Sequence, residues 1–422
     1  MQGSKLISII SSMILISLLV GCQNEVKNIE RPEKIVSKRE VVYNLETYSK
    51  LAKLWSDYYK EFPSEDAYAN WMYASRYAKL PEYESLLSEG IVKYSANPTL
   101  LYLKALLKHG EKENLENLHL LERATKLDPS YLDPWFALTI NYLEAGDMEK
   151  LDVALRHILE GGAIADEILD YNYNVLTLLE KNSILITNGD NDTYPGWILT
   201  RILKYRTDIK IVNRSLLNTE WYPALIKNET ELNFITQENL NLLRKGILDN
   251  IKKAEYKSGP FSDTLITYIV ETAKDQNRPI YFASTLYSTD IIKRYKSEGR
   301  NLGLVTLITP SKKKHSMQIE AMFKKWIKEF RVGGLNSWKL RYGNKSLAGK
   351  RIVMNYAASI YKLMDEIKKF NPELRLELFY WYRENLSHVL NPDYLDKINE
   401  TWCKSNDINE ISDWCKKGNY IK

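Results

Sequence analysis

Two aspartates separated by one residue are the clearest candidates for chemistry in this 422-residue chain. Asp190 and Asp192 lie in "ILITNGDNDTYPGW", where the first residues predict a buried strand and those from about Pro195 predict a helix. Two carboxylates at positions i and i+2 of a loop can reach one cation, and oxygen ligands suit Mg²⁺, Mn²⁺ or Ca²⁺. The stretch therefore predicts either a divalent metal site or a turn in which Asp192 or Thr193 caps the helix.

Polar residues also follow two other predicted strands. Because ligands of open α/β sheets bind outside the C-terminal ends of the strands, these loops are expected to form one polar crevice. Gly189 is expected to tolerate a side chain least, since the chain turns tightly there. The candidate ligand-binding residues are Gly189, Asp190, Asn191, Asp192, Asn213, Ser215 and Ser284. Asp190 and Asp192 are the candidate metal ligands, and a divalent cation is the only cofactor that these residues suggest.

Strands alternate with helices from residue 182 to residue 312. The predicted strands are 183–187, 209–213, 279–284 and 302–308. This alternation predicts a parallel sheet covered on both faces, in a Rossmann-like α/β domain. Neither the G-x-G-x-x-G nor the P-loop pattern is present, which argues against nucleotide binding by those devices. None of the five His lies in a strand-end loop, so no Ser/His/Asp or Cys/His arrangement is predicted.

Paired amphipathic helices are predicted before this domain, from residue 43 to residue 181. The clearest unit is 128–162, with Gly146 in the turn between its helices. Its residues that match the W-x₂-L-x₃-Y face of a tetratricopeptide repeat are Trp135, Leu138 and Tyr142. Thr139 stands where the repeat usually has Gly, so we interpret the region as a degenerate array of TPR-like helical repeats. Such arrays bind a peptide or partner protein on their concave face.

The N-terminus has the pattern of an exported protein. Lys5 precedes an apolar run from Leu6 to Val20. That run is shorter than the roughly 20 residues of a spanning helix, and it fits a secretory signal peptide over residues 1–21.

The apolar run ends in Leu19-Val20-Gly21-Cys22, which resembles the lipobox of bacterial lipoproteins. The resemblance implies cleavage before Cys22 and acylation of that residue, which anchors the protein to a lipid bilayer. Residues 22–42 are polar and aperiodic, and are expected to form a tether. Residue 23 is Gln rather than Asp, which favours the outer membrane of a Gram-negative bacterium.

Residues 313–422 are predicted to form a helical C-terminal region. Near its end, Cys403 and Cys415 make a closely spaced pair. In an oxidising compartment such a pair predicts a disulfide, and no His lies beside them to suggest a metal site. Trp402 and Trp414 each precede a Cys and are expected to pack over the bridge.

The charge balance argues against a nucleic-acid partner. The chain has 59 basic and 54 acidic residues, a net charge of +5. It contains no basic stripe with interleaved aromatic residues, which nucleic-acid binding would require.

Four segments together resemble a known family. They are "NSILITNGDNDTYPGWIL", "RTDIKIVNRSLLNTEWY", "RPIYFAST" and "FRVGGLNSWKLRYGNKSLAGKRIVMNYAASI". They resemble the soluble C-terminal part of bacterial multi-pass membrane proteins that are similar to protein O-mannosyltransferases, from Asn182 to Ile360. No loop of this chain matches the membrane-embedded acidic site of that family. The resemblance therefore implies a fold and a recognition role in extracytoplasmic glycosylation, without glycosyl transfer.

Two functional hypotheses follow. The first is an envelope-anchored lipoprotein that acts as a protein- or glycan-binding or scaffold module, in extracytoplasmic glycosylation or export. Its expected partners are the bilayer through acylated Cys22, a protein or peptide on the repeat face, and a glycan as the alternative ligand. The second is a metal-dependent enzyme that acts on a glycan or phosphorylated substrate through Asp190 and Asp192. The two hypotheses differ in whether these carboxylates converge on one point.

Overall fold

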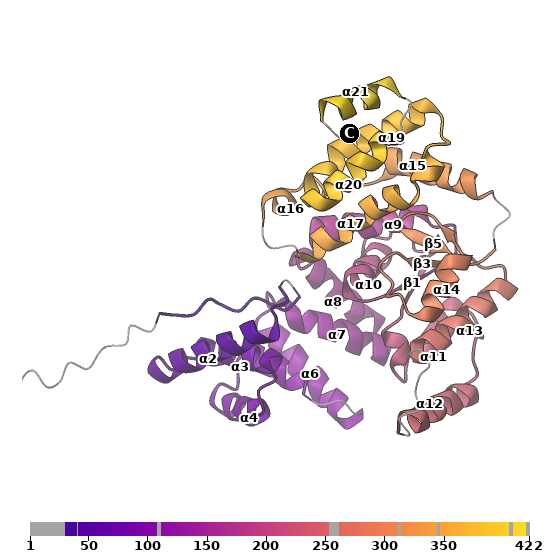
Figure 1. Ribbon diagram of the computed structural model, residues 1–422. Coiled ribbons are helices and arrows are strands. Elements are labelled where there is room, and N and C mark those ends of the chain that lie inside the picture. Colours follow the sequence, from indigo (N-terminus) through magenta and orange to yellow (C-terminus); the bar gives the residue numbers. More distant parts are fainter. Residues whose placement is uncertain are drawn as a thin grey trace, which may run out of the picture. The chain divides into compact units, whose positions relative to one another are not determined.

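The computed structural model describes residues 30–39, 41–107, 111–252, 261–310, 314–343, 347–404 and 408–418 (Figure 1). The chain is mostly helical and contains one small mixed sheet. It divides into two compact units, which are Met1–Ile35 with Asn44–Leu100 and Val36–Tyr43 with Leu101–Lys422. The division at Leu100 falls inside the predicted repeat region. The predicted signal peptide and Cys22 lie outside the described residues.

The first unit consists of helices. They are α2 (Leu45–Glu61), α3 (Glu65–Ala78) and α4 (Tyr83–Lys93). The side chains of Asn44 and Ser64 accept hydrogen bonds from backbone N–H groups in the first turns of α2 and α3, which fixes where the two helices begin. A short connection makes α2 and α3 a hairpin, and Trp55 and Met72 are fully buried in its core.

The second unit begins with further helices after α5 (Pro98–Ala105), which contains the boundary between the units. They are α6 (Glu111–Leu127), α7 (Leu132–Ala145), α8 (Met148–Glu160) and α9 (Asp166–Leu178). Helices α7 and α8 form the predicted hairpin, and Gly146 turns the chain between them at φ +72°. All three residues of the predicted repeat face, Trp135, Leu138 and Tyr142, are buried. A helical hairpin with a buried face therefore forms here.

A five-stranded sheet follows, with the strand order β2-β1-β3-β5-β4. Its strands are β1 (Ile184–Thr187), β2 (Lys210–Asn213), β3 (Ile280–Ala283), β4 (Arg300–Asn301) and β5 (Val305–Leu307). β1 is central and pairs in parallel with both β2 and β3. The intervening segments are α10 (Asp190–Trp197), the π-helical turn η1 (Ile198–Ile202), the turn η2 (Leu216–Asn218), α11 (Tyr222–Thr230), α12 (Gln237–Lys252), α13 (Phe261–Asp275) and α14 (Asp290–Glu298).

The sheet is not all parallel, so the prediction for its last strand is wrong. β5 lies in the predicted strand 302–308, but it runs antiparallel to β3 and to β4. The chain leaves α14 directly into β4 and returns through a tight turn at Gly303, whose φ is +75°. A tight turn can only join antiparallel strands, because a parallel pair needs a long crossover. The Rossmann-like assignment of residues 182–312 is therefore not confirmed, and the sheet is mixed.

The C-terminal region is helical, as predicted. Its elements are α15 (His315–Glu329), α16 (Trp338–Tyr342), α17 (Leu347–Lys362), α18 (Met364–Ile367), α19 (Pro372–Asn385), η3 (Ser387–Val389), α20 (Pro392–Cys403) and α21 (Asn409–Lys417). Trp326, Tyr356 and Trp381 meet at its centre, with ring centroids 5.4–6.0 Å apart. Asn174 of α9 donates to the hydroxyl of Tyr356 at 2.8 Å and to the carbonyl of Arg331 at 2.9 Å, which ties this bundle to the helix that precedes the sheet.

A disulfide joins Cys403 of α20 to Cys415 of α21, with the Cα atoms 5.7 Å apart. Trp402 and Trp414, which were expected to pack over the bridge, each precede one of its cysteines. Both pack against Phe379 of α19, with ring centroids 5.4 and 5.1 Å away. The bridge therefore holds the last helix of the described chain against the bundle.

None of the helices in the described ranges is long and apolar enough to cross a membrane.

Candidate functional site

Helix α10 starts earlier than the sequence suggests. It begins at Asp190, immediately after Gly189, rather than near Pro195. Pro195 lies within the helix and has no N–H to donate to the carbonyl of Asn191 four residues earlier. The side chain of Asn172 donates to that carbonyl instead, at 2.8 Å. A contact from α9 thus permits a proline inside the helix.

Asp192 lies in the first turn of α10 and points into the protein interior. Its side chain is almost fully buried, at 4% exposure. The two carboxylate oxygens accept the backbone N–H groups of Asn188 and Gly189 at 2.8 and 2.9 Å, and the hydroxyl of Thr285 at 2.5 Å. Burial raises the pKa of Asp192, and these hydrogen bonds oppose that rise. Asp192 therefore links β1, the start of α10 and the loop after β3.

Asp190 points elsewhere. Its side chain is 62% exposed and forms an ion pair with Arg39, with Nη1 and Oδ2 2.6 Å apart. Arg39 also lies over the ring of Phe136, at 4.0 Å from the centroid. Residues i and i+2 of an α-helix project about 200° apart. The structure therefore does not bring the carboxylates of Asp190 and Asp192 to one point.

The other potential metal ligands of the described residues do not form a site either. In the described ranges, no group of three or more His, Cys, Asp or Glu side chains could hold a metal ion.

The remaining predicted site residues lie at the strand ends and bond to the protein itself. Asn213 donates to the hydroxyl of Thr193 at 2.9 Å, and Ser215 donates to the carbonyl of Asn188 at 3.0 Å. Ser284 donates to the carbonyl of Gly303 at 2.9 Å. These hydrogen bonds make the strand ends a cross-linked polar cluster, in which Asn213, Ser215 and Ser284 each support a neighbouring loop.

Gly189 is less constrained than expected. Its φ of −159° is extended, and a Cβ added there would meet no atom within 4 Å. The structure therefore gives no steric reason for glycine at this position. The glycine that does enforce packing is Gly196, where an added Cβ would lie 2.6 Å from Ile211.

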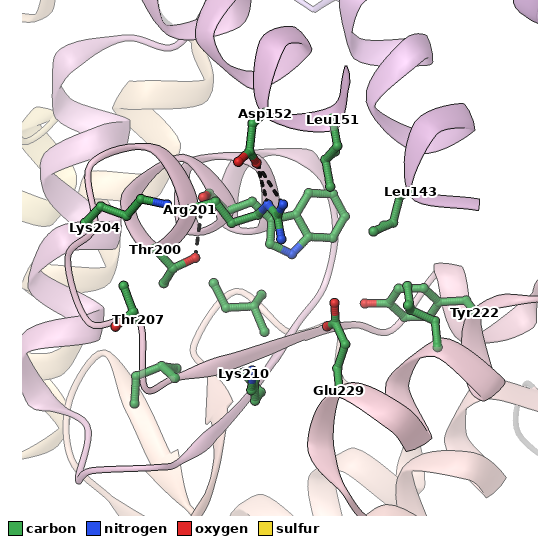
Figure 2. Close-up of a pocket in the computed structure, with 14 residues that line it drawn as sticks. Leu143, Leu151, Asp152, Thr200, Arg201, Lys204, Thr207, Lys210, Tyr222 and Glu229 are labelled. Atoms are coloured by element: carbon green, nitrogen blue, oxygen red, sulfur yellow. Dashed lines mark hydrogen bonds and ion pairs between the residues drawn. The ribbon is translucent and has the colours of Figure 1, made fainter. Parts of the chain in front are cut away.

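A cavity of about 250 Å³ lies beside β2, which is the edge strand of the sheet (Figure 2). We call it the edge cavity. It is lined by Leu143, Leu151, Asp152, Trp197, Thr200, Arg201, Lys204, Thr207, Ile209, Lys210, Ile211, Tyr222, Leu225 and Glu229. These residues come from the α7–α8 hairpin, from α10 with its π-helical turn, from β2 and from α11. Four elements that are separate in the sequence thus enclose one space.

The edge cavity combines charged groups with aromatic and aliphatic walls. Figure 2 shows Asp152 and Arg201 on one side and Glu229 and Tyr222 on the other. Arg201 donates from Nε and Nη2 to the same oxygen of Asp152, both at 2.8 Å. Trp197 and Tyr222 are 8% and 1% exposed, so they are fixed parts of the wall. The cavity therefore combines a buried aromatic wall with a partly exposed ion pair on one side.

Glu229 contributes a carboxylate to the wall of the edge cavity. It is half-buried, and burial raises the pKa of its carboxyl, while the positive charges of Lys210 and Arg201 oppose the rise. In the part of the chain that the structure describes, the side chains of Glu229 and Lys210 form no hydrogen bond or ion pair, although the charge of Lys210 acts on Glu229. Groups of this kind remain able to bind a ligand.

Sequence reasoning missed the edge cavity. Its charged residues lie at the start of β2 and on the helices that flank it, whereas the strand-end rule pointed to the opposite end of β2. One signal was available. β2 is the predicted strand in which Lys210 interrupts an otherwise apolar run, as expected for a strand with an open edge.

The comparisons with known proteins point to the same part of the chain. Residues 168–233 match the family model TMEM260-associated domain 2, a family linked to O-mannosyltransferase-like proteins. The match covers a minor part of the chain, and it overlaps the predicted resemblance from residue 182 to residue 233. No curated protein matches the chain. All residues that line the edge cavity fall in the matched segment except Leu143, Leu151 and Asp152.

Proposed function

We propose that this protein is a lipid-anchored recognition module of the cell envelope that binds its ligand in the edge cavity and serves extracytoplasmic glycosylation. The observation that carries the proposal is the cavity itself. It is preformed, it has buried aromatic walls, and it holds the carboxylate of Glu229 and the amine of Lys210, whose side chains form no hydrogen bond or ion pair among the described residues. Convergent polar groups on an apolar wall are typical of binding sites.

The family match supports the link to glycosylation. The matched segment supplies most of the cavity wall, and it belongs to a family linked to O-mannosyltransferase-like proteins. The helical hairpins before the sheet domain are proposed to hold a protein partner, as other helical repeats do. A metal-dependent enzyme that uses Asp190 and Asp192 has less support, because one carboxylate is buried in hydrogen bonds and the other pairs with Arg39.

Lipid anchoring at Cys22 is part of this proposal, and it rests on the lipobox-like sequence Leu19-Val20-Gly21-Cys22. Cys22→Ser is expected to move the protein from the membrane fraction to the soluble fraction and to abolish labelling by a fatty-acid analogue. The reason is that the thiol carries the lipid, and each buried CH₂ of the acyl chains contributes about 0.8 kcal/mol to membrane binding. A wild-type protein that is soluble and unlabelled would contradict this part of the proposal.

Ligand binding in the edge cavity is testable with two probe sets, an array of oligosaccharides and a displayed library of random linear heptapeptides. Glu229→Gln and Lys210→Met are each expected to weaken binding of the selected probe by about tenfold, which corresponds to about 1.4 kcal/mol. The matched control is Glu231→Gln. Glu231 lies two residues after Glu229, is exposed and does not line the cavity.

The pH dependence gives a second measure of the same site. Because the folded protein raises the pKa of Glu229, its carboxylate becomes protonated at a higher pH than an ordinary glutamate. Binding that uses this carboxylate is therefore expected to weaken as the pH falls through the raised pKa, and Glu229→Gln should remove that dependence. The proposed site is wrong if the selected probes bind the Glu229 and Lys210 variants as tightly as they bind wild type.

A further inference from the structure

Strand β2 has one paired and one open side. The N–H groups of Lys210 and Arg214 donate to the carbonyls of Ser183 and Thr187 at 3.0 and 2.9 Å, on the side of β1. The N–H of Asn213 points to the other side, where the hydroxyl of Tyr222 accepts it at 2.9 Å. β2 is the last strand in the sheet order at this end. Its outer side therefore faces no other strand.

The backbone N–H and C=O of Ile211 point to the outer side of β2. In a strand, the N–H and C=O of one residue point to the same side, and successive residues alternate. Ile211 stands two residues before Asn213, so its N–H and C=O also point away from β1. Ile211 and Ile209 both line the edge cavity. The outer side of β2 therefore carries a backbone donor and acceptor for another strand, at a residue that also lines the edge cavity.

We propose that the edge cavity binds an extended polypeptide segment, which adds to the sheet beside β2 and pairs with the N–H and C=O of Ile211. This inference rests on the proposed function and names the class of ligand. Addition of a peptide strand to an open sheet edge obtains its affinity from main-chain hydrogen bonds and its specificity from pockets for alternate side chains.

The size of the edge cavity favours a chain segment over a whole small molecule. Its volume is about 250 Å³. Pockets that enclose a complete small ligand are typically about 300–1,000 Å³. A segment that only passes through needs less space, because its two ends leave the cavity.

The ends of the pairing region are set by neighbouring groups. The hydroxyl of Tyr222 already accepts the N–H of Asn213, so the added segment cannot continue along β2 beyond Ile211. The N–H of Ile209 bonds to the carbonyl of Arg206 at 3.0 Å, which closes the other end. The segment therefore makes one pair of backbone hydrogen bonds with β2, and we expect modest affinity.

The charged lining of the edge cavity indicates the preferred side chains. Lys210 is expected to attract an acidic side chain, and Glu229 a hydrogen-bond donor, because neither side chain forms a hydrogen bond or ion pair among the described residues. Arg201 and Asp152 already satisfy each other. The preferred segment is thus extended. It carries an acidic side chain and a hydrogen-bond donor at alternate positions, beside a residue that fits between Trp197 and Tyr222.

The test uses the full chain and a synthetic peptide taken from the heptapeptide selection. Ile211→Pro removes the outward N–H without removing a hydrogen bond to β1, and proline is tolerated on edge strands with that orientation. The matched control is Ile211→Val, which keeps the N–H and most of the buried side chain. The proline variant is expected to bind the peptide at least about tenfold more weakly, and the valine variant within about threefold of wild type.

A second readout covers the case in which the proline variant does not fold. A series of peptides, each N-methylated at one backbone position, is titrated into the wild-type chain. Strand addition predicts that one position loses binding while the others retain it, and that the Ile211 amide becomes protected from hydrogen exchange in the complex. Equal binding of all methylated peptides, or an unprotected Ile211 amide, would overturn strand addition.

The oligosaccharide array separates this inference from the proposed function. If an oligosaccharide binds in a manner that Glu229→Gln and Lys210→Met weaken, while no peptide depends on these residues, strand addition is wrong and the recognition site stands. If neither probe set contains a ligand that depends on the two residues, both proposals are wrong.

Discussion

Asp192→Ala is expected to lower the free energy of unfolding by about 3 kcal/mol, because it leaves buried donors without an acceptor at a cost of about 1–3 kcal/mol each. The donors are the N–H groups of Asn188 and Gly189 and the hydroxyl of Thr285. The start of α10 also loses a negative charge that its free N–H groups favour. Urea denaturation of wild type and variant at pH 7 measures the difference.

Two further substitutions show whether this loss comes from the hydrogen bonds. Asp190→Ala removes a carboxylate two residues away whose partner Arg39 is only partly buried, so it should cost less than about 1 kcal/mol. Asp192→Asn should fall between the two, because an amide can accept with one oxygen and presents its NH₂ to the other donors. Equal losses for Asp190→Ala and Asp192→Ala would contradict the role given to Asp192.

The double substitution Cys403→Ser with Cys415→Ser is expected to destabilise the C-terminal helices by about 3 kcal/mol, since the bridge closes a short loop and restricts the unfolded chain. Cys415 is fully buried and Cys403 is 9% exposed, so the serine hydroxyls also enter an apolar environment. The loss should concentrate in α20 and α21, because both helices are tied to the bundle through Phe379. Amide hydrogen exchange, residue by residue, measures where protection falls.

The matched control is the reduced wild-type protein, which lacks the bridge but keeps both thiols. It should lose most of the same protection. The double alanine variant separates the polarity of serine from the loss of the cross-link. Mass spectrometry that finds Cys403 and Cys415 as free thiols in the non-reduced protein would contradict the disulfide.

Local sequence patterns predicted the helices and strands well where residues close together in the chain decide the structure. The apolar runs that became β1, β2 and β3 are short, buried and separated by long segments, so their pattern has one interpretation. Trp135, Leu138 and Tyr142 share a helix face, and that face is buried. The pairing of Cys403 with Cys415 followed from their short spacing. In each case the residues that decide the structure are close together in the chain.

Predictions that needed distant contacts were less accurate. The start of α10 moved to Asp190 because Asn172 of α9 serves the carbonyl that Pro195 leaves without a donor. The direction of β5 depended on the turn at Gly303, which a pattern of apolar residues does not reveal. The two carboxylates of the opening motif separated because a helix, and not a loop, carries them.

The sequence by itself determined most of the helices, the strands β1 to β3, the burial of Trp135, Leu138 and Tyr142, and the cysteine pair, because periodicity and spacing act over a few residues. Only the tertiary structure decided which polar side chains remain available to bind a ligand. Asp190 and Asp192 are engaged by Arg39 and by the strand-end loops, whereas Lys210 and Glu229 face the edge cavity at the open side of β2. The physical reason is that both properties depend on segments that are far apart in the chain. Such segments decide whether a strand has a neighbour on each side, and whether a carboxylate has hydrogen-bond donors around it.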